Sequence, residues 1–390
     1  MTASVTSISK VRAAARDRAE RIRMNSRTST TLLVVVVVLV VIGLGATQSA
    51  SSAIALDDTQ DRFFYFKRQL LGVGLGTIAL LVASRVPYRF YRRLALPSFF
   101  LTVGLLVAVL MMGDMRGGAT RWLNVGGFSF QPSELAKVTV VFVLAYLLER
   151  KHKLLARFSH LIVPLIATVG VVGVLVMRQP DLGTLIVIGA AAMAVVMASD
   201  SPFRYVALLA VAAVLVTTFL AFDEGYRTDR ISGFLDPYAD AQGNGYQVIQ
   251  GYYALGNGGI FGVGLGASRA RWFYLPNAHT DFIFAIIGEE TGLIGGLTII
   301  GLFIVLALAG WAVTARAPDR FGRMVAAGIT VWLSFQALVN IGGVLGVMPI
   351  TGIALPFISF GSTALVVAMA SIGILVNISK SGVSEVNRGR

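Results

Sequence analysis

Residues 31–50 read TLLVVVVVLVVIGLGATQSA, a run of aliphatic and small side chains without a single charge. About 20 residues of helix cross a bilayer core of about 30 Å, so this run is long enough to span a membrane. The apolar core of a cleaved signal peptide is shorter, about 7–15 residues. We therefore predict an uncleaved first transmembrane helix, preceded by a basic N-terminal tail over residues 1–30.

Nine further apolar segments follow the first one. They lie at residues 69–84, 94–112, 131–148, 158–178, 182–199, 203–221, 282–313, 323–346 and 361–379. Glycines and prolines between residues 346 and 356 favour a turn and divide the last two segments. Transmembrane β-barrels show short alternating segments instead of such long runs. The sequence therefore predicts an all-α polytopic integral membrane protein with about ten transmembrane helices.

The composition agrees with a membrane environment. Hydrophobic residues make up 56% of the 390 positions and charged residues 14%, whereas soluble domains are about half apolar and about a quarter charged. The net charge of +13 does not indicate nucleic-acid binding, because the basic residues lie at the ends of the apolar runs. The chain has no cysteine and three scattered histidines, so no metal site is predicted.

The basic residues also predict the orientation of the chain. If the N-terminus lies inside the cell, 22 of the 33 Lys and Arg residues fall on the cytoplasmic side, ten fall on the outer side and Lys137 lies within a helix. The positive-inside rule therefore places both the tail over residues 1–30 and the C-terminal tail over residues 380–390 in the cytoplasm. The transmembrane domain occupies residues 31–379 between them.

One predicted loop is much longer than the others. It covers residues 222–280, between the seventh and eighth helices, on the outer side. Long loops in compact proteins are usually functional or disordered, and this one contains too many aromatic residues for a disordered linker. We expect this large extracytoplasmic loop to fold against the membrane surface.

Asp281 follows this loop and directly precedes the eighth helix, at the end of the stretch SRARWFYLPNAHTD of residues 268–281. A carboxylate near the N-terminus of a helix is favoured by the helix dipole, by about 0.3–1 kcal/mol, and its side chain can cap the helix. Capping and a functional role therefore both remain open on the residues alone.

Four charged residues lie within or at the ends of the predicted helices. A charge inside a bilayer costs a few kcal/mol unless it has a partner or faces a cavity. Glu289 and Glu290 point about 100° apart on a helix, so at least one is expected to have a structural partner, while a functional site is the alternative. Lys137 and Asp181 lie at matching depth, and we predict a structural ion pair between them.

Arginine and aromatic residues gather in the predicted outer loops. Arg121 and Trp122 lie in one loop, and Arg269 and Arg271 lie shortly before Asp281. Arginine binds phosphate with two donors at once, and a carboxylate can act as a general base. This combination suits a substrate with a phosphate and a sugar. Because nucleotide sugars are cytoplasmic, a donor used outside the cell has to be linked to a lipid.

At these motifs the sequence resembles the SEDS family (shape, elongation, division and sporulation), the ten-span peptidoglycan glycosyltransferases. The resemblance covers about residues 31–379, and AIIGEE after HTDFIF is more similar to the FtsW cell-division branch than to the RodA elongation branch. Small departures from the family pattern occur at Asn277, Thr291 and Ser362. The motifs are GGATRWLNVGGFSFQPSELAK (117–137), QPDLGT (179–184), GYQVIQGYYALGNGGIFGVGLGASRARWFYLPNAHTDFIFAIIGEETGLIGG (245–296) and PITGIALPFISFGSTALV (349–366).

The resemblance implies that Asp281 is the catalytic base for polymerising lipid II into β-1,4 glycan strands, with inversion, on the outer face of the bacterial cytoplasmic membrane. Its implied partners are membrane lipid, a class B penicillin-binding protein acting as transpeptidase, and other division proteins at the septum. The resemblance implies no definite cofactor, and a divalent cation, Mg²⁺ or Mn²⁺, is compatible with the reaction. The residues expected to bind the pyrophosphate or the sugar are Arg121, Trp122, Ser268, Arg269, Arg271, His279 and Glu289.

Two other classes of function compete with this interpretation. A lipid II flippase or another transporter would also contain intramembrane charges such as Glu289, Lys137 and Asp181. Transporters place their site near the midplane, however, whereas the polar residues of this chain concentrate on the outer side. A non-enzymatic scaffold for division proteins is the third alternative, and it predicts that Asp281 can be changed without loss of glycan synthesis.

Overall fold

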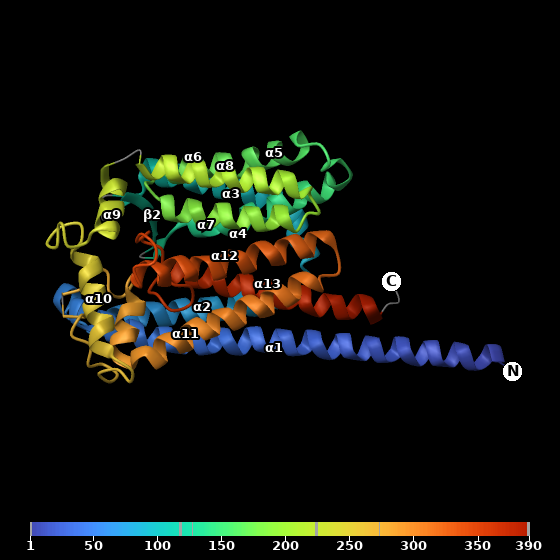
Figure 1. Ribbon diagram of the computed structural model, residues 1–390, viewed down its shortest axis with the longest axis horizontal. Coiled ribbons are helices and arrows are strands. Elements are labelled where there is room, and N and C mark those ends of the chain that lie inside the picture. The colour runs from blue at the N-terminus through green and yellow to red at the C-terminus, as the bar shows by residue number, and fades with distance from the viewer. Residues whose placement is uncertain (1, 117–118, 127, 223–224, 273, 388–390) are drawn as a thin grey trace.

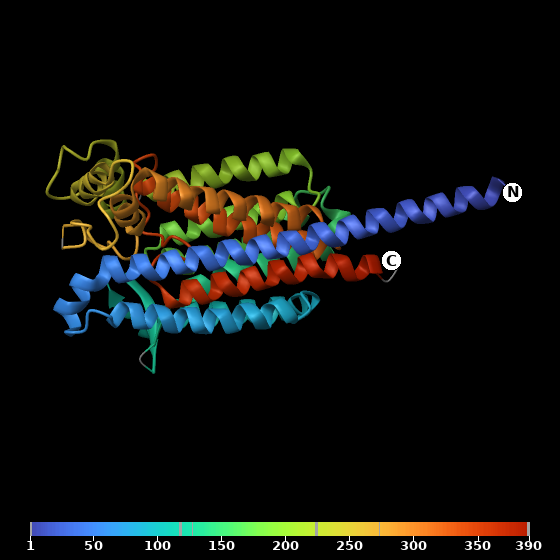
Figure 2. The ribbon, with the colours of Figure 1, turned by 90° about the horizontal axis from the view of Figure 1, so that it is seen from below.

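The computed structural model describes residues 2–116, 119–126, 128–222, 225–272 and 274–387. These ranges leave out three glycines of the motif at 117–137 and three residues of the predicted loop 222–280. They also leave out the last three residues of the predicted C-terminal tail. These positions lie outside the described residues. The described chain forms an elongated bundle in which the long helices run side by side (Figures 1 and 2).

The bundle consists of long helices joined mostly by short connections. α1 begins at the same end of the molecule at which α13 finishes, and α9 and α10 lie at the opposite end (Figure 1). We call the end with α9 and α10 the outer end and the other the inner end. The helices are α1 (Thr2–Thr59), α2 (Phe64–Arg85), α3 (Arg89–Met112), α4 (Pro132–Arg150), α5 (Ser159–Leu165), α6 (Val171–Met177), α7 (Leu182–Met197), α8 (Phe203–Phe222), α9 (Gly225–Leu235), α10 (Tyr246–Gly258), α11 (Ile283–Ala315), α12 (Arg320–Val344) and α13 (Ser362–Asn387).

Helices occupy all ten segments that the sequence predicts. Within the described residues, eight are long and apolar enough to cross a membrane, with α5 and α6 joined by a π-helical turn at Ile166–Gly170 into one of them. α7 is apolar but has only 16 residues, and α4 has 19 residues with a buried Glu134 and Lys137. The all-α polytopic fold is confirmed, while ten crossings stay a prediction. The predicted basic tail is helical from Thr2 and continues into the first span.

Three short strands interrupt the helical fold at the outer end. β1 (Asp114–Arg116), β2 (Ala119–Val125) and β3 (Phe128–Phe130) form one antiparallel sheet in that order. They lie between α3 and α4, in the stretch that the sequence analysis treats as an outer loop. The sheet gives this connection a defined path, because each backbone ladder fixes the register of its neighbour.

Small residues allow the central helices to approach one another closely. α2 and α13 pack along their length, and a Cβ atom at Gly373 would lie 2.4 Å from the carbonyl oxygen of Leu80. Such contacts stabilise helix pairs in membranes, where lipid provides little hydrophobic driving force. α12 and α13 are buried over most of their length, so they form the centre around which the other helices are arranged.

α11 is broken near its outer end. Gly292 has non-helical backbone angles, with φ of 67°. The connection after α10 pairs with the backbone at this break, because the amide of Val263 donates to Glu289 O at 2.9 Å and the amide of Leu293 donates to Gly259 O at 2.9 Å. The predicted loop 222–280 therefore contains two helices, α9 and α10, and a segment that is held against α11.

Candidate active site

Asp281 lies at the outer end, two residues before α11 begins. The N-cap residue of α11 is Phe282, and no side chain caps this helix. The capping role considered for Asp281 is therefore wrong. Its backbone oxygen accepts a hydrogen bond of 2.9 Å from the side-chain amide of Asn340 on α12. This bond fixes the position of Asp281 beside the centre of the bundle.

An irregular segment between α12 and α13, residues 345–361, runs beside Asp281. Ser359 donates to the carbonyl of Thr280 at 2.6 Å, and the amide of Phe360 donates to the carbonyl of His279 at 3.0 Å. Ile353 and residues 355–359 of this segment are buried, and buried backbone groups outside regular structure need side-chain partners. Asn340 and Gln336 of α12 provide them, donating to Ile353 O at 2.7 Å and Ala354 O at 2.8 Å.

Three charged side chains from three other elements act on the Asp281 carboxyl group. They are Arg230 of α9, Arg121 of β2 and Asp181, the residue that precedes α7. Gly352 of the irregular segment shows how close two of these groups come. A Cβ atom there would lie 3.2 Å from Arg230 Nη1 and 3.6 Å from Asp281 Oδ2, and its φ is +73°. Glycine therefore leaves the space in which the guanidinium and the carboxylate face one another.

The environment of Asp281 raises its pKa to about 6. Burial is the largest cause, because removal from water disfavours the charged form, and the charge of Asp181 adds to it. The guanidinium groups of Arg230 and Arg121 act in the opposite direction. A carboxyl group with a pKa near 6 is mostly ionised at pH 7 and is more basic than an ordinary aspartate, which is suitable for a general base.

The two arginines direct donors at backbone oxygens and not at the carboxylate. Arg121 donates from Nε to Gln179 O at 2.9 Å and from Nη2 to Pro180 O, and Arg230 donates to Ile350 O at 3.3 Å. Within the described ranges, no hydrogen bond or ion pair reaches the side-chain oxygens of Asp281. The carboxylate is thus held in place through its backbone, and its oxygens remain available to a substrate.

Two of the other predicted substrate-binding residues, Ser268 and Glu289, are joined by a hydrogen bond. Ser268 donates to the Glu289 carboxylate, which also accepts from the amides of Arg269 and Ala270 at 3.3 Å each. Glu289 therefore anchors the connection before α11, as the structural alternative requires. Glu290 accepts a hydrogen bond from Ser49 of α1, and the side chain of Arg269 is exposed.

No hydrogen bond or ring contact among the described residues joins His279, Trp122 or Arg271 to the Asp281 carboxylate, so their part in substrate binding stays a prediction. The His279 ring lies between Tyr65 and Phe360, with ring centroids 4.9 and 5.8 Å away. Burial lowers its pKa to about 4, so it is neutral at pH 7. Trp122 is partly buried on β2, next to Arg121 in the sequence, and Arg271 lines a separate cavity between α1 and α11.

Lys137 does not pair with Asp181. Its ammonium group donates to Glu134 at 2.7 Å and to Gln336 at 2.9 Å. The Asp181 carboxylate instead accepts from the amide and hydroxyl groups of Thr184, at 3.1 and 2.9 Å, and caps α7. The predicted ion pair is therefore wrong, because each residue has a nearer partner within one turn of its own helix.

The structure adds Arg230, Asn340 and Gly352 to the residues around Asp281. Arg230 is recognisable in the sequence only as one cation of the long loop, and nothing local connects residues 340 and 352 with 281. Among the described residues, no group of three His, Cys, Asp or Glu side chains could hold a metal ion.

Comparisons with known proteins support the same architecture. The family model of FtsW, RodA and SpoVE, described as cell cycle protein, matches residues 29–383. The chain is 40% identical over 333 residues to the probable peptidoglycan glycosyltransferase FtsW of Geobacter metallireducens, covering 85% of this chain and 89% of the relative. It is also 40% identical over 336 residues to stage V sporulation protein E of Bacillus subtilis, covering 85% and 91%.

Solved structures show similar folds. A chain from a peptidoglycan synthase complex, described as coordinating polymerization and crosslinking, aligns with a TM-score of 0.73 at 30% identity, over 90% of this chain and 97% of that one. The rod shape determining protein RodA of Thermus thermophilus aligns with a TM-score of 0.63 at 26% identity, over 90% and 96%. Because the family model covers nearly the whole bundle and the same fold recurs in these structures, this multi-pass membrane protein belongs to the FtsW/RodA/SpoVE family, the SEDS family that its motifs resemble.

Proposed function

We propose that this protein is a peptidoglycan glycosyltransferase that polymerises lipid II into β-1,4 glycan strands on the outer face of the cytoplasmic membrane, for septal wall synthesis in cell division. The names of its relatives support this proposal. The observation that carries it is the Asp281 carboxylate, which lies at the outer end between Arg230 and Arg121, has a pKa of about 6 and receives no hydrogen bond from any described residue.

In the proposed reaction Asp281 removes the proton from the 4-hydroxyl group of the acceptor sugar. The oxygen attacks the anomeric carbon of the lipid-linked glycan, and the bond from that carbon to the pyrophosphate oxygen breaks. Undecaprenyl pyrophosphate leaves with the electron pair, and a single displacement inverts the α-linkage to β. Proton removal by a positioned base contributes about 10²- to 10⁴-fold to such a rate.

Arg121 and Arg230 are proposed to stabilise the leaving pyrophosphate. Arg121 is fixed by two backbone carbonyls, and a guanidinium group has five N–H donors, so it keeps capacity for phosphate oxygens. Positive charge that is already in position where negative charge develops lowers the barrier without reorganisation. A divalent cation at the pyrophosphate is compatible with this arrangement, but no step depends on it.

The proposal is tested by polymerisation of purified lipid II with the detergent-solubilised full chain. Asp281→Asn and Asp281→Ala are expected to lower the rate by at least about 10²-fold, whereas Asp57→Asn, an exposed carboxylate at the outer end of α1, is the matched control. Polymerisation by both Asp281 variants at the native rate would disprove the base assignment. Movement of lipid II across liposomes without glycan formation would support the flippase instead.

The proposed partner is a class B penicillin-binding protein that cross-links the new glycan, together with other division proteins at the septum. The structural neighbour from a complex for polymerization and crosslinking supports this partner. Cytoplasmic termini are part of the same proposal, and they agree with α1 beginning and α13 finishing at one end (Figure 1). Co-purification of the full chain with a co-expressed class B penicillin-binding protein tests the partnership, and independent elution of the two proteins would contradict it.

A further inference from the structure

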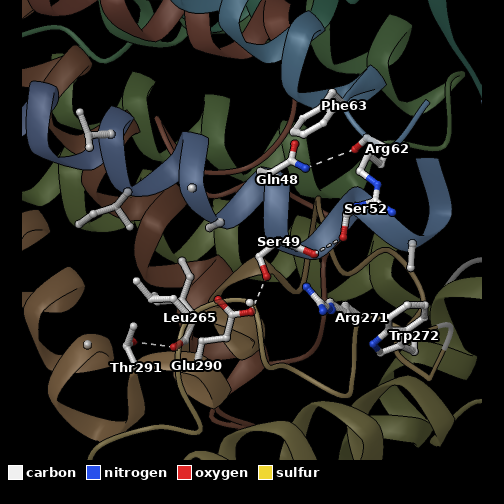
Figure 3. A pocket seen from close by; sticks show the side chains of 18 of the residues that line it. Gln48, Ser49, Ser52, Arg62, Phe63, Leu265, Arg271, Trp272, Glu290 and Thr291 are labelled. Carbon is white, nitrogen blue, oxygen red and sulfur yellow. Dashed lines mark hydrogen bonds between the residues drawn. The ribbon is translucent and has the colours of Figure 1, made fainter. Parts of the chain in front are cut away.

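A cavity of about 880 Å³ lies between α1, α11 and the connection before α11 (Figure 3). Its size is at the upper end of the range for ligand-binding pockets, about 300–1,000 Å³. Among the described residues, none of the side chains around Asp281 lines it: Arg121, Asp181, Arg230 and Gly352 are all absent from its walls. It is therefore a site separate from the reaction centre.

The wall of this cavity changes from apolar to polar along its length. Its apolar part is formed by residues within α1 and α11, among them Val41, Ile42 and Ile299. Its polar part lies where these helices reach the outer end, and includes Arg62, just beyond α1, and Arg271. Such a gradient, with cations at the membrane boundary, fits an amphiphile with an acyl chain and a phosphate headgroup.

The two arginines are directed into the polar part of the cavity. Arg271 lies with its guanidinium carbon 5.4 Å from the centroid of the Trp272 ring, and its Nε is buried without a hydrogen-bond partner among the described residues. A buried donor without a partner is unfavourable, and a bound acceptor would satisfy it. The carbonyl oxygen of Arg62 accepts from Gln48 of α1 at 3.4 Å and holds this residue at the cavity (Figure 3).

A carboxylate in the same wall distinguishes between headgroups. Glu290 lines the cavity, and one of its oxygens accepts a hydrogen bond from Ser49 (Figure 3). A purely anionic headgroup, such as a polyprenyl pyrophosphate, would meet this negative charge. A headgroup that carries an amine beside its phosphate complements both the arginines and the carboxylate.

We infer that this cavity binds a membrane glycerophospholipid with an amine-bearing headgroup, such as phosphatidylethanolamine. The phosphate lies between Arg62 and Arg271, the ammonium group lies toward Glu290, and an acyl chain follows the apolar wall along Val41 and Ile299. This lipid is neither the donor nor the acceptor of the proposed glycosyl transfer, so the site exists whether or not that proposal holds.

Native mass spectrometry of the delipidated full chain in detergent tests the inference. The probes are palmitoyl-oleoyl phosphatidylethanolamine, palmitoyl-oleoyl phosphatidylglycerol and undecaprenyl phosphate. We expect one saturable phosphatidylethanolamine site and an apparent Kd that is about tenfold higher in the Arg62→Ala/Arg271→Ala double variant. Arg269→Ala, an exposed cation that does not line the cavity, is the matched control and should bind as the native chain does.

Two further variants keep the test valid if the double variant folds poorly. A Cβ atom at Gly45, which lines the cavity, meets nothing within 4 Å, so Gly45→Leu should fill the space and remove the binding. Gly74→Leu on α2, where a Cβ also meets nothing within 4 Å, is its control. Glu290→Gln should abolish the preference for phosphatidylethanolamine over phosphatidylglycerol.

Three results would overturn the inference. They are the absence of any saturable phospholipid site, the same Kd for the native chain and both cavity variants, and stronger saturable binding of undecaprenyl phosphate than of either phospholipid. The last result would assign the cavity to a polyprenyl lipid. None of them bears on the polymerisation test of Asp281, because no step in that test uses the cavity.

Discussion

The inner and outer ends of the bundle contain the same kinds of charged residue in opposite arrangements. At the inner end Asp319 caps α12 through the amide of Gly322 at 2.7 Å, accepts from the hydroxyl of Tyr88 at 2.7 Å and lies 3.5 Å from Arg89. At the outer end Arg121 and Arg230, which act on the Asp281 carboxyl group, donate to the backbone carbonyls of Gln179 and Ile350. Asp319 is thus paired on every side, whereas no described side chain pairs with the carboxylate of Asp281, the proposed base.

The inner end repeats its pattern at other loops. Arg92 lies 3.1 Å from Glu149, and Asp200 pairs with Arg320 at 3.8 Å and with Arg323. These contacts connect several of the inner connections to one another. Such pairs are worth little individually when exposed. The Asp281 carboxylate, by contrast, has no hydrogen bond or ion pair with any described side chain.

The largest expected effect separates these two carboxylates. Asp281→Asn is expected to lower lipid II polymerisation by at least about 10²-fold with the melting temperature unchanged, because no described residue depends on its side chain. Asp319→Ala should retain polymerisation but lower the melting temperature, since the helix cap and the ion pair are both lost. Activity assays and thermal unfolding in detergent measure both. If the two variants behave alike, the distinction between the ends is wrong.

Breaking the buried pair in the middle of the bundle is expected to have the next largest effect. Lys137→Met leaves Glu134 and Gln336 without their shared donor, and loss of one partner of a buried pair costs about 3–5 kcal/mol. Thermal unfolding in detergent should show a large loss, and Lys137→Met/Glu134→Gln should restore part of it. A single variant as stable as the native chain would show that the pair does not stabilise the fold.

Gly352→Ala tests the space between Arg230 and Asp281. A methyl group there would lie 3.2 Å from the guanidinium, at a φ of +73° that disfavours alanine, with a cost of about 1–3 kcal/mol. We expect kcat/KM for lipid II to fall by about tenfold, although no functional group is removed. Gly104→Ala on α3, where a Cβ meets nothing within 4 Å, is the control. Unchanged activity would mean that this space is not used.

The smallest expected effect is a shift along the pH axis. The pKa of Asp281 is about 6, so polymerisation should fall as the pH decreases through 6 and the base becomes protonated. Arg230 lowers this pKa, so Arg230→Gln should move the acid limb of the pH–rate profile to higher pH, by up to about one unit. A shift to lower pH, or no acid limb in the native profile, would contradict the assignment.

The helices and the place of Asp281 are predictable from the sequence because both depend on local pattern. Apolar runs mark the ten helical segments, and a carboxylate directly before such a run is visible by inspection. The pairing of Lys137 with Glu134 is also predictable from the sequence, because residues three apart share one face of a helix. A partner within one turn is favoured over a more distant one. Capping of α7 by Asp181 could be expected for the same reason.

The rest of the site depends on contacts between residues that are distant in the sequence. Arg230 lies near Asp281 because α9 is placed at the outer end of the bundle (Figure 1). Asn340 is 59 positions away from Asp281 in the sequence and binds its backbone oxygen. Arg271 precedes Asp281 by only ten residues in the sequence. It nevertheless lines the cavity between α1 and α11, which Asp281 does not line. Neither hydrophobic periodicity nor spacing contains this information.

The irregular segment at residues 345–361 has no hydrogen-bonded ladder of its own, so its shape is encoded elsewhere. Gln336 and Asn340 of α12 and Gln69 of α2 bind its backbone, and Gln69 both donates to Ser359 O at 3.1 Å and accepts from the amide of Gly361 at 3.2 Å. An exchange of any of these amides for its acid would keep the volume and delete the donor. Three amide side chains outside the segment therefore determine the path of its backbone.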